Sequence, residues 1–450
     1  MASTTYLTRT PSSAGNRKTF TFSAWIKGQT RNPAGTTGGT LFSCGTHISN
    51  GPMFIIDFLN GQNLRVEDTL ADGSQPINLR TNRVFRDTNA WYHIVVAVDT
   101  TQGTSTDRVK IYVNGVQETS LSHTTYPNQN IDTSVNNTHL HVIGSRAAGL
   151  TNKYFDGCMS HVHFVDGTAY SASTFGSTDS TTGEWKINTS PTLTMGTNGF
   201  TILKDGNTIT DQSSNSNNWT LAGGTLTKTE DNPSNVFATM NPLDNQNQGS
   251  TFTAGNTKLE WNTNNKNNFA TLAMNAGKYY WEMKYVITTG GTNAMIGVSK
   301  LDTRQGDDWV GHDSTAWSYY ASDGNKYHSG SNSAYGNSWA VDDIIGIAFD
   351  ADTRTIWFSK NGTWQNSATI SEIAAGTTTN AAYTNMGTAG EFFIPCMSGY
   401  DGNKAAFNFG NGYFSTTAVS SAGTNASNLG IFEYDVPTGY TALCTKGLNE

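Results

Sequence analysis

The sequence predicts an all-β protein made of two antiparallel, jelly-roll-like β-sandwiches, and three observations support this. Apolar and polar residues alternate in many short runs, which is the two-residue period of a strand with one buried face. Turn-forming residues separate the runs, because Gly (46 residues), Ser, Thr and Asn are abundant while charged residues are only 14% of the chain. A length of 450 residues exceeds one ordinary core and suggests more than one domain.

The clearest element of the first half is the stretch RVKIYVNGVQ at 108–117. It predicts a strand followed by a tight turn, because Asn114-Gly115 readily adopts the positive φ angles of a two-residue hairpin. The preceding apolar run at 91–99, WYHIVVAVD, is the expected partner strand. The side chains predicted to face a core are Val109, Ile111 and Val113.

The second half repeats this pattern in the stretch RTIWFSKNGTWQ at 354–365. The apolar run that precedes it, at 342–350, also ends on Asp. Ile356 and Phe358 are predicted to face a core, and Asn361-Gly362 is predicted to form the turn. The opposite, polar face of this strand is expected to carry Thr355, Trp357 and Ser359.

Further strands are expected on both sides of a polar region. They lie at 18–26, 40–44, 53–59, 139–144, 157–165, 278–287, 294–299, 391–397 and 404–409. Ser, Thr, Asn and Gly dominate the region between the two sets. We therefore predict a first sandwich at 1–170, an irregular connector at 171–235, a second sandwich at 236–415 and a C-terminal tail at 416–450.

Charge and composition argue against several classes of partner. The formal net charge is −8 and no basic block occurs, so we expect no nucleic-acid partner. Apolar stretches are strand-sized, and the N-terminal residues lack the apolar core of a secretory signal, so we expect no membrane insertion. Four scattered cysteines without a CxxC pair fit free thiols in a reducing cytosol, and a disulfide is the alternative, which spacing does not reveal: Cys44, Cys158, Cys396 and Cys444.

No catalytic residue is predicted. Glycoside hydrolysis needs two carboxylates placed across one bond, and the nearest candidate is Glu433-Tyr434-Asp435 in the tail. Two His-x-His pairs could share a metal ion, but we expect them to be polar residues on the solvent faces of strands: His139/His141 and His161/His163. Asp57 could contribute to a calcium site, yet no loop has a dense run of oxygen ligands. We predict no metal and no cofactor.

The richest candidate surface is the aromatic and polar stretch 307–339. Flat aromatic rings bind sugar faces or protein partners, and Asp, Ser and Asn supply hydrogen bonds. We predict that the binding residues are Trp309, Trp317, Tyr319, Asp323 and Trp339, with Trp309 and Trp317 as anchors. The alternative is that several of these rings belong to the core, Tyr320 and Tyr327 especially.

Several of these stretches resemble known families. Residues 18–166 resemble a laminin-G-like, concanavalin A-type lectin domain through FTFSAWIKG (20–28), WYHIVVAVD, RVKIYVNGVQ and FDGCMSHVHFVDG (155–167). Residues 236–411 resemble a SPRY domain through GKYYWEMKYV (277–286), IGVSK (296–300), DGNKYHSG (323–330), DDIIGIAFDADTRTIWFSKNG and FFIPCMSGYDGNKAAFNFG (392–410). Both resemblances imply antiparallel β-sandwiches. Concanavalin-type glucanases carry catalytic carboxylates at alternating positions of one strand, and no such run is present.

Nearly the whole chain resembles structural proteins of tailed, especially marine, bacteriophages. The stretches that carry this similarity are the start (6–27), NPSNVFATMNPLD (232–244) and VPTGYTALCTKGLNE (436–450). The resemblance implies a virion protein assembled in the host cytoplasm, with tail-fibre or receptor-binding work on host surface glycans or proteins. It also implies contacts with other virion proteins and a homo-oligomer, a trimer if the protein is a fibre. The alternatives are a capsid-decorating or adaptor protein that binds only virion proteins, and a surface polysaccharide hydrolase.

Overall fold

The structure, a computed structural model, describes residues 4–28, 39–46, 51–60, 62–147, 153–244, 249–289, 291–303 and 308–449. The chain divides into two compact units, Met1–Lys228 and Thr229–Glu450. Each unit is a β-sandwich, so the predicted all-β fold class is confirmed. The described residues contain no helix that is long and apolar enough to cross a membrane.

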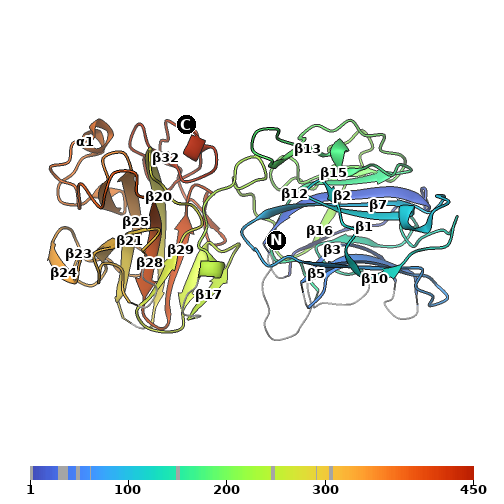
Figure 1. The fold of residues 1–450 in the computed structure, drawn as a ribbon, viewed down its shortest axis with the longest axis horizontal. Coiled ribbons are helices and arrows are strands. Elements are labelled where there is room, and N and C mark those ends of the chain that lie inside the picture. Colours follow the sequence, from blue (N-terminus) through green and yellow to red (C-terminus); the bar gives the residue numbers. More distant parts are fainter. Residues whose placement is uncertain are drawn as a thin grey trace. The chain divides into compact units, whose positions relative to one another are not determined.

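The first unit packs an eight-stranded antiparallel sheet against a six-stranded one (Figure 1). The larger sheet, in the order β10-β6-β5-β4-β3-β11-β1-β16, contains β1 (Tyr6–Arg9), β3 (Thr40–Gly45), β4 (Met53–Phe58), β5 (Asn63–Thr69), β6 (Ile77–Val84), β10 (Leu121–Thr125), β11 (His141–Ile143) and β16 (Thr220–Gly223). The smaller sheet, in the order β15-β12-β2-β7-β8-β9, contains β2 (Thr19–Lys27), β7 (Trp91–Asp99), β8 (Val109–Val113), β9 (Val116–Gln117), β12 (Cys158–Asp166) and β15 (Phe200–Ile202).

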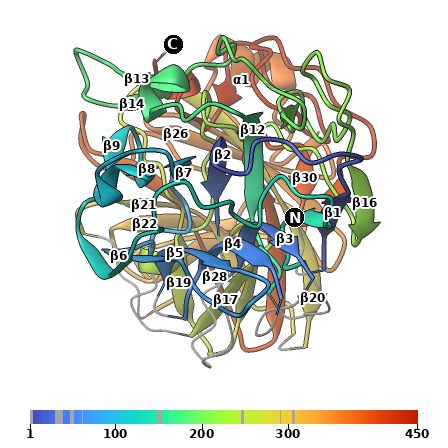
Figure 2. The same ribbon diagram turned by 90° about the vertical axis from the view of Figure 1, so that its right-hand side faces the viewer.

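A short ribbon covers the outer face of the six-stranded sheet in this unit. It consists of β13 (Gly176–Thr178) and β14 (Trp185–Ile187), and Figure 2 shows it beside β8 and β9. Trp185 of β14 joins a small apolar cluster with Val95 of β7 and Phe175. Two 3-10 helices complete the unit: η1 (Ser105–Asp107) and η2 (Ala172–Thr174).

The second unit is also a two-sheet sandwich. Its larger sheet, in the order β17-β18-β29-β20-β25-β26-β27 with β32 beside β20, contains β17 (Ser250–Thr253), β18 (Lys258–Trp261), β20 (Lys278–Thr288), β25 (Ile344–Asp350), β26 (Thr355–Lys360), β27 (Thr363–Trp364), β29 (Asn403–Asn408) and β32 (Thr441–Ala442). Its smaller sheet, in the order β19-β28-β21-β22-β23-β24, contains β19 (Lys266–Phe269), β21 (Ala294–Lys300), β22 (Ala316–Tyr320), β23 (Asn325–His328), β24 (Ser331–Ala334) and β28 (Phe393–Gly399). The remaining elements are the ribbon β30 (Tyr413–Phe414) and β31 (Thr417–Ala418), the helix α1 (Ile370–Ala375), and the 3-10 helices η3 (Pro242–Asp244) and η4 (Gly447–Asn449).

The predicted core positions are confirmed in both units. Val109, Ile111 and Val113 are at most 3% exposed and pack between the sheets of the first unit. Ile356 and Phe358 are fully buried between the sheets of the second unit. Each strand therefore turns its alternating apolar face inward, as the two-residue period requires.

The opposite face of β26 is not a solvent face, so that expectation is wrong. Trp357 is fully buried in a second apolar cluster on the far side of the sheet, together with Tyr280 of β20. Helix α1 and the C-terminal segment supply the cover through Ile373, Phe432 and Tyr440. Both faces of the larger sheet are covered in this region because the chain beyond the sandwich folds back onto it.

The two Asn-Gly hairpins have the same geometry. Asn114 and Gly115 have φ angles of 48° and 82°, and Asn361 and Gly362 have φ angles of 49° and 77°. These positive values are those of a tight hairpin turn. In each case the Asn side chain also accepts a hydrogen bond from a backbone nitrogen near the start of the partner strand. Asn114 Oδ1 lies 2.7 Å from the backbone nitrogen of His93, and Asn361 Oδ1 lies 2.8 Å from the backbone nitrogen of Ile344.

An aromatic ring lies against the glycine of each turn. A Cβ added to Gly115 would stand 2.3 Å from the Trp185 ring, and one added to Gly362 would stand 2.6 Å from the Tyr434 ring. Both rings come from segments that follow the hairpin strands in the sequence. Each turn therefore requires a glycine at this position for two reasons, the positive φ angle and the close approach of the ring.

The region predicted as an irregular connector, 171–235, is mostly an integral part of the first unit. β15 pairs with β12, and β16 pairs with β1. The Asp166 carboxylate accepts hydrogen bonds from the backbone nitrogens of Asn16 (2.7 Å) and Asn198 (2.9 Å) and so ties the region to the N-terminal strands. Likewise the predicted tail at 416–450 is not separate from the second sandwich, because β32 pairs with β20.

Candidate functional site

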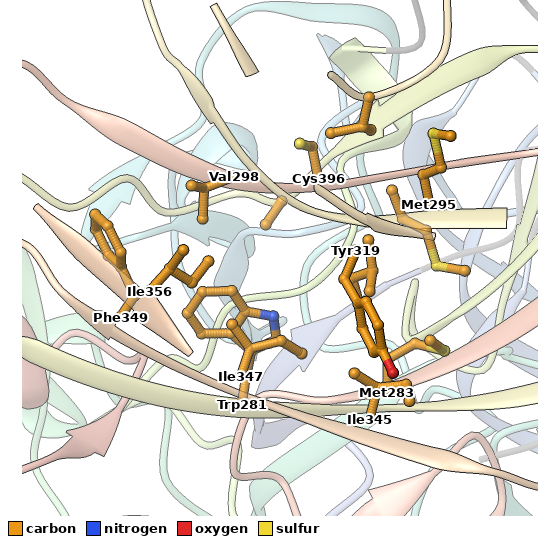
Figure 3. Close-up of a cluster of buried hydrophobic side chains, with 14 of the residues drawn as sticks. Trp281, Met283, Met295, Val298, Tyr319, Ile345, Ile347, Phe349, Ile356 and Cys396 are labelled. Carbon is orange, nitrogen blue, oxygen red and sulfur yellow. The ribbon is translucent and has the colours of Figure 1, made fainter. Parts of the chain in front are cut away.

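Three of the five predicted binding residues lie in the core. Trp317, Tyr319 and Trp339 are 5%, 0% and 1% exposed, so the exposed position predicted for them is wrong. Figure 3 shows Tyr319 reaching between the sheets toward Met283 and Ile345. Trp317 and Tyr319 fill the sandwich because their face of β22 points at the other sheet, and Trp339, from the loop before β25, packs against Tyr319 with ring centroids 6.1 Å apart.

The other two predicted residues, Trp309 and Asp323, lie at the surface. Trp309 is half-buried and Asp323 is exposed. Two tyrosines that the sequence suggested as core residues, Tyr320 and Tyr327, are half-buried beside them. We call Trp309, Tyr320 and Tyr327 the aromatic strip.

The rings of the aromatic strip meet edge to face. The Trp309 and Tyr327 centroids are 5.5 Å apart with an interplanar angle of 89°, and those of Tyr327 and Tyr320 are 5.4 Å apart at 84°. His312, which is exposed, extends the row with its ring 5.2 Å from that of Trp309. Edge-to-face contacts at these distances are favourable, so the strip is held in shape before any ligand arrives.

Hydrogen bonds hold both tyrosine hydroxyls. The Tyr327 hydroxyl donates to Asp323 Oδ2 at 2.8 Å, and the Tyr320 hydroxyl donates to Asn293 Oδ1 at 2.7 Å. Asp323 in turn accepts from the backbone nitrogen of Asn325 at 2.8 Å. Burial and the Asp323 carboxylate raise the pKa of Tyr327 to about 12, and burial raises the pKa of Tyr320, so both hydroxyls remain protonated at neutral pH.

The local sequence explains why the strip forms. In β22 the side chains of Trp317 and Tyr319 point inward, so Tyr320 points outward. Ser318 pairs with Tyr327 across the β22–β23 ladder, which puts Tyr327 on the same outer face. The loop that carries Trp309 then lies over this face through Gly311, where φ is +97° and a Cβ would stand 2.5 Å from the Tyr327 carbonyl oxygen.

The charged groups attached to the strip are mainly acidic. Asp323 bonds to Tyr327, while Asp308 Oδ2 lies 3.1 Å from His312 Nδ1. Rings with neighbouring carboxylate and amide groups can stack on an apolar face of a ligand and hydrogen-bond its edge. The acidic groups disfavour an anionic ligand.

The histidine pairs are not on solvent faces, so that expectation is wrong for three of the four residues. His141, His161 and His163 are buried, and only His139 is half-buried. His141 Nδ1 lies 2.8 Å from the His139 carbonyl oxygen, and His163 Nδ1 lies 2.9 Å from Thr201 Oγ1. Within the part of the chain that the structure describes, no group of three or more metal-ligating side chains forms a cluster.

A fourth buried histidine, His93, lies between two tryptophan rings. Its ring stacks on Trp25 at 4.9 Å and on Trp185 at 6.0 Å between centroids. Trp185 Nε1 donates to His93 Nδ1 at 3.0 Å, so the proton of a neutral ring is on Nε2, which lies 2.9 Å from Ser23 Oγ. His93 is therefore a packing residue that holds the β13–β14 ribbon on the sheet.

These histidines give a prediction about acid stability. Burial lowers the pKa of His93 and His163 to about 3, and that of His141 and His161 to about 4. The unfolded state, with histidine pKa values of about 6.5, binds more protons below that pH, so we expect stability to fall as the pH drops from about 6.5 toward 3. The measurement is the urea midpoint of the full chain, followed by tryptophan fluorescence over this pH range.

The control for this prediction is His93→Gln, which removes one titrating ring. This variant is expected to show a shallower dependence of the midpoint on pH than the wild type. Asp68 acts in the opposite direction, because burial raises the pKa of its carboxyl group to about 7. If the urea midpoint of the wild type instead rises as the pH falls from about 6.5 to 4, the carboxyl groups contribute more than the histidines to the pH dependence of stability.

Asp57, the possible calcium ligand, is fully buried in an ion-pair network. Its carboxylate accepts two hydrogen bonds from Arg65, both at 2.8 Å, and one from Arg146 at 2.7 Å. Arg65 also donates to Glu67 at 3.0 Å. Two guanidinium groups occupy the oxygens that a cation would need, so Asp57 does not suit a calcium site.

Glu433 and Asp435 both accept hydrogen bonds from backbone groups of neighbouring loops. The Glu433 carboxylate accepts from the backbone nitrogen of Ser420 at 2.7 Å, and the Asp435 carboxylate accepts from that of Thr424 at 2.6 Å. These bonds fold the C-terminal loops onto each other. Both carboxylates of the candidate pair are therefore engaged in hydrogen bonds that hold these loops.

Comparisons with known proteins match two separate parts of the chain. Residues 2–174 match the family model of the concanavalin A-like lectin/glucanases superfamily, of the laminin G type, and residues 278–412 match that of the SPRY domain. Among solved structures, the SPRY domain of human HERC1 is similar at 23% identity over 36% of this chain and 92% of that chain, with a TM-score of 0.29. The PSpry domain of TRIM65 is similar at 13% identity over 38% of this chain and 91% of that chain, with a TM-score of 0.30. The chain thus combines a concanavalin A-like domain with a SPRY domain, two kinds of domain that typically bind rather than catalyse.

Proposed function

We propose that this chain is a non-catalytic recognition protein that binds carbohydrate through the aromatic strip of its SPRY domain. The observation that carries the proposal is the arrangement of Trp309, Tyr320 and Tyr327. Their rings are partly exposed, are fixed edge to face, and keep both hydroxyl groups hydrogen-bonded.

A neutral sugar matches this surface better than an acidic one. A pyranose ring presents C–H groups on its face and hydroxyl groups on its edge, which suits aromatic rings next to Asp323, Asn293 and Asn325. An anionic sugar would meet the carboxylates of Asp308 and Asp323 and would be disfavoured by like charge. The ligand class that the strip supports is therefore a neutral or amino-substituted glycan.

We further propose that the protein acts in a virion. The support is the similarity of the stretches at 232–244 and 436–450 to structural proteins of tailed bacteriophages. In this role the chain is assembled in the host cytoplasm, contacts other virion proteins, and displays several copies of the strip to a host surface glycan, as a trimer if it is a fibre. Repetition raises avidity without any new contact. The alternative role, a capsid-decorating or adaptor protein, predicts contacts with virion proteins and no glycan binding.

The test is glycan binding by the full chain and by Trp309→Ala. Loss of the indole ring removes the largest flat surface of the strip, so we expect affinity to fall by roughly 1–3 kcal/mol, as for other hot-spot residues. Binding to an array of neutral and acidic glycans is measured first, followed by titration of the best ligand. Thermal melting of each variant verifies the fold.

The matched control is Phe392→Ala, because Phe392 is an aromatic residue of the same unit that is 43% exposed and lies outside the strip. This control is expected to bind like the wild type. If Trp309→Ala melts and binds like the wild type, the strip is not the binding site. If no glycan binds the wild-type chain at all, the adaptor role is favoured.

A further inference from the structure

A closed loop of the chain covers the outer face of the six-stranded sheet in the first unit. It comprises residues 168–195 and carries the β13–β14 ribbon, and we call it the strap. Hydrogen bonds close its base. The backbone nitrogen of Asp166 donates to the Met195 carbonyl oxygen at 3.0 Å, and that of Thr194 donates to the Tyr170 hydroxyl at 3.1 Å. Both ends of the strap are therefore fixed, and its middle part lies on the sheet through side-chain contacts.

Two aromatic side chains anchor the middle of the strap. Phe175 is buried against Val95 of β7. Trp185 of β14 stacks on His93 with ring centroids 6.0 Å apart, and its Nε1 donates to His93 Nδ1 at 3.0 Å. β13 and β14 have three residues each, and a two-stranded ribbon of this size is not stable alone. The ribbon is therefore ordered only while these anchors hold it on the sheet.

The hydrogen bond between Trp185 and His93 requires a neutral imidazole ring. An indole Nε1 can only donate, so His93 Nδ1 has to accept. Protonation places a hydrogen atom on Nδ1, and two N–H groups then face each other. The same proton places a charge on a ring that is fully buried, where a charge without an opposite partner is unfavourable. Proton uptake by His93 and closure of the strap therefore oppose each other.

A second buried histidine lies under the same strap. The His163 ring is 5.6 Å from that of Phe175, and the His161 ring is 6.3 Å from that of His163. Burial lowers the pKa of His93 and His163 to about 3, and for His163 the neighbouring imidazoles and Lys204 act in the same direction. Both rings are therefore neutral while the strap is closed and gain protons more readily once it opens.

The carboxyl groups around the strap change charge in a lower pH range. Asp179 and Lys186 form an ion pair of 2.6 Å within the ribbon, and the Lys186 ammonium holds the pKa of Asp179 well below its usual range. The other carboxyl groups on the strap, at its base and beside His161 are those of Glu184, Asp166 and Asp205. Ordinary carboxyl groups titrate near pH 4, so histidines dominate the change between pH 7 and pH 5.

We propose that the strap is a proton-released cover, in which proton uptake by His93 and His163 detaches the β13–β14 ribbon and uncovers the sheet face around Val95 while both sheets stay folded. The direction follows from linkage. Histidine in the open state has an ordinary pKa of about 6.5, so the open state binds more protons and is favoured as the pH falls below that value. For His93 alone, the opening equilibrium constant is expected to rise about 25-fold from pH 7 to pH 5.

The test is hydrogen exchange of the full chain at pH 7, 6 and 5, measured by mass spectrometry and corrected for the intrinsic effect of pH on exchange. Peptides that cover 172–188 report on the strap, and peptides of β2 and β7 report on unfolding of the whole unit. The protection factor of the strap is expected to be below that of β2 and β7 at every pH. It is expected to fall by at least about 25-fold from pH 7 to pH 5.

Two variants assign this change to the histidine. His93→Gln keeps an acceptor for Trp185 and does not titrate, so the fall in strap protection is expected to be smaller by about 25-fold. The matched control, Asp179→Asn, removes the ion pair of the ribbon and is expected to keep the full pH dependence.

The wild-type measurement decides the proposal even if His93→Gln fails to fold. The proposal is overturned if the strap is as protected as β2 and β7, because it then opens only when the unit unfolds. It is also overturned if strap protection is the same at pH 7 and pH 5, if His93→Gln keeps the full pH dependence, or if Asp179→Asn abolishes it.

Discussion

Replacing Asp57 by alanine is expected to destabilise the first unit by about 3–5 kcal/mol, the usual cost of removing one partner from a buried ion pair. Asp57 is fully buried, and its carboxylate forms ion pairs with both Arg65 and Arg146. Without its carboxylate, two guanidinium groups remain close together with little solvent to screen them. The measurement is the free energy of unfolding of the full chain in urea.

The control for this result is Asp132→Ala. Asp132 lies 4.0 Å from Arg17 at the surface and is 54% exposed, so its loss is expected to leave the unfolding midpoint close to that of the wild type. Asp57→Asn retains the volume of the side chain and one acceptor oxygen. Its unfolding midpoint is therefore expected to lie between those of Asp57→Ala and Asp132→Ala. Equal midpoints for Asp57→Ala and Asp132→Ala would contradict the assigned role of the buried network.

Replacing Glu282 by alanine is expected to destabilise the second unit on the order of 3–4 kcal/mol, because each buried donor left unpaired costs about 1–3 kcal/mol. The Glu282 carboxylate is fully buried on β20. It accepts from the backbone nitrogens of Glu433 and Tyr434, both at 2.9 Å, and from Asn408 Nδ2 and the Tyr280 hydroxyl, both at 3.1 Å. The variant is expected to release the C-terminal segment first, and limited proteolysis followed by mass spectrometry measures this.

Glu282→Gln tests the electrostatic part of this role. Burial raises the pKa of Glu282 to about 7, although its hydrogen bonds act in the opposite direction. Because the folded pKa exceeds the unfolded value of about 4.5, this group stabilises the fold most at low pH and less as the pH rises through 7. The free-energy cost of Glu282→Gln is therefore expected to be larger near pH 5 than near pH 8. A cost that grows with pH would show that the carboxylate is the stabilising form.

The candidate site was predictable only in part. The composition of 307–339 located Trp309 and Asp323 correctly at a surface rich in aromatic residues. The same stretch also suggested Trp317 and Tyr319 as surface rings and Tyr320 as a core ring, and the structure reverses this assignment. In the strand AWSYY both faces carry an aromatic side chain, so alternation separates the two faces but does not show which one meets the opposite sheet.

The sequence also did not predict which polar and charged side chains are buried. The strand β5 alternates Leu64 and Val66 with Arg65 and Glu67, a pattern that normally indicates a solvent-facing side. The structure buries that side, and Arg65 is satisfied there by Asp57, from the neighbouring strand. Such pairing depends on strand order and register, which local patterns do not contain.

The sequence by itself determined the all-β class, the two sandwiches and the two Asn-Gly hairpins, because a two-residue period and a positive-φ turn are local properties. Only the tertiary structure decided which outer faces of the sheets are covered by other segments of the chain. Trp185 reaches the turn at Gly115, and Tyr434 reaches the turn at Gly362, from segments far along the chain. A side chain's burial depends on every segment that packs over it, so residues distant in sequence determine it and the strand's own pattern does not.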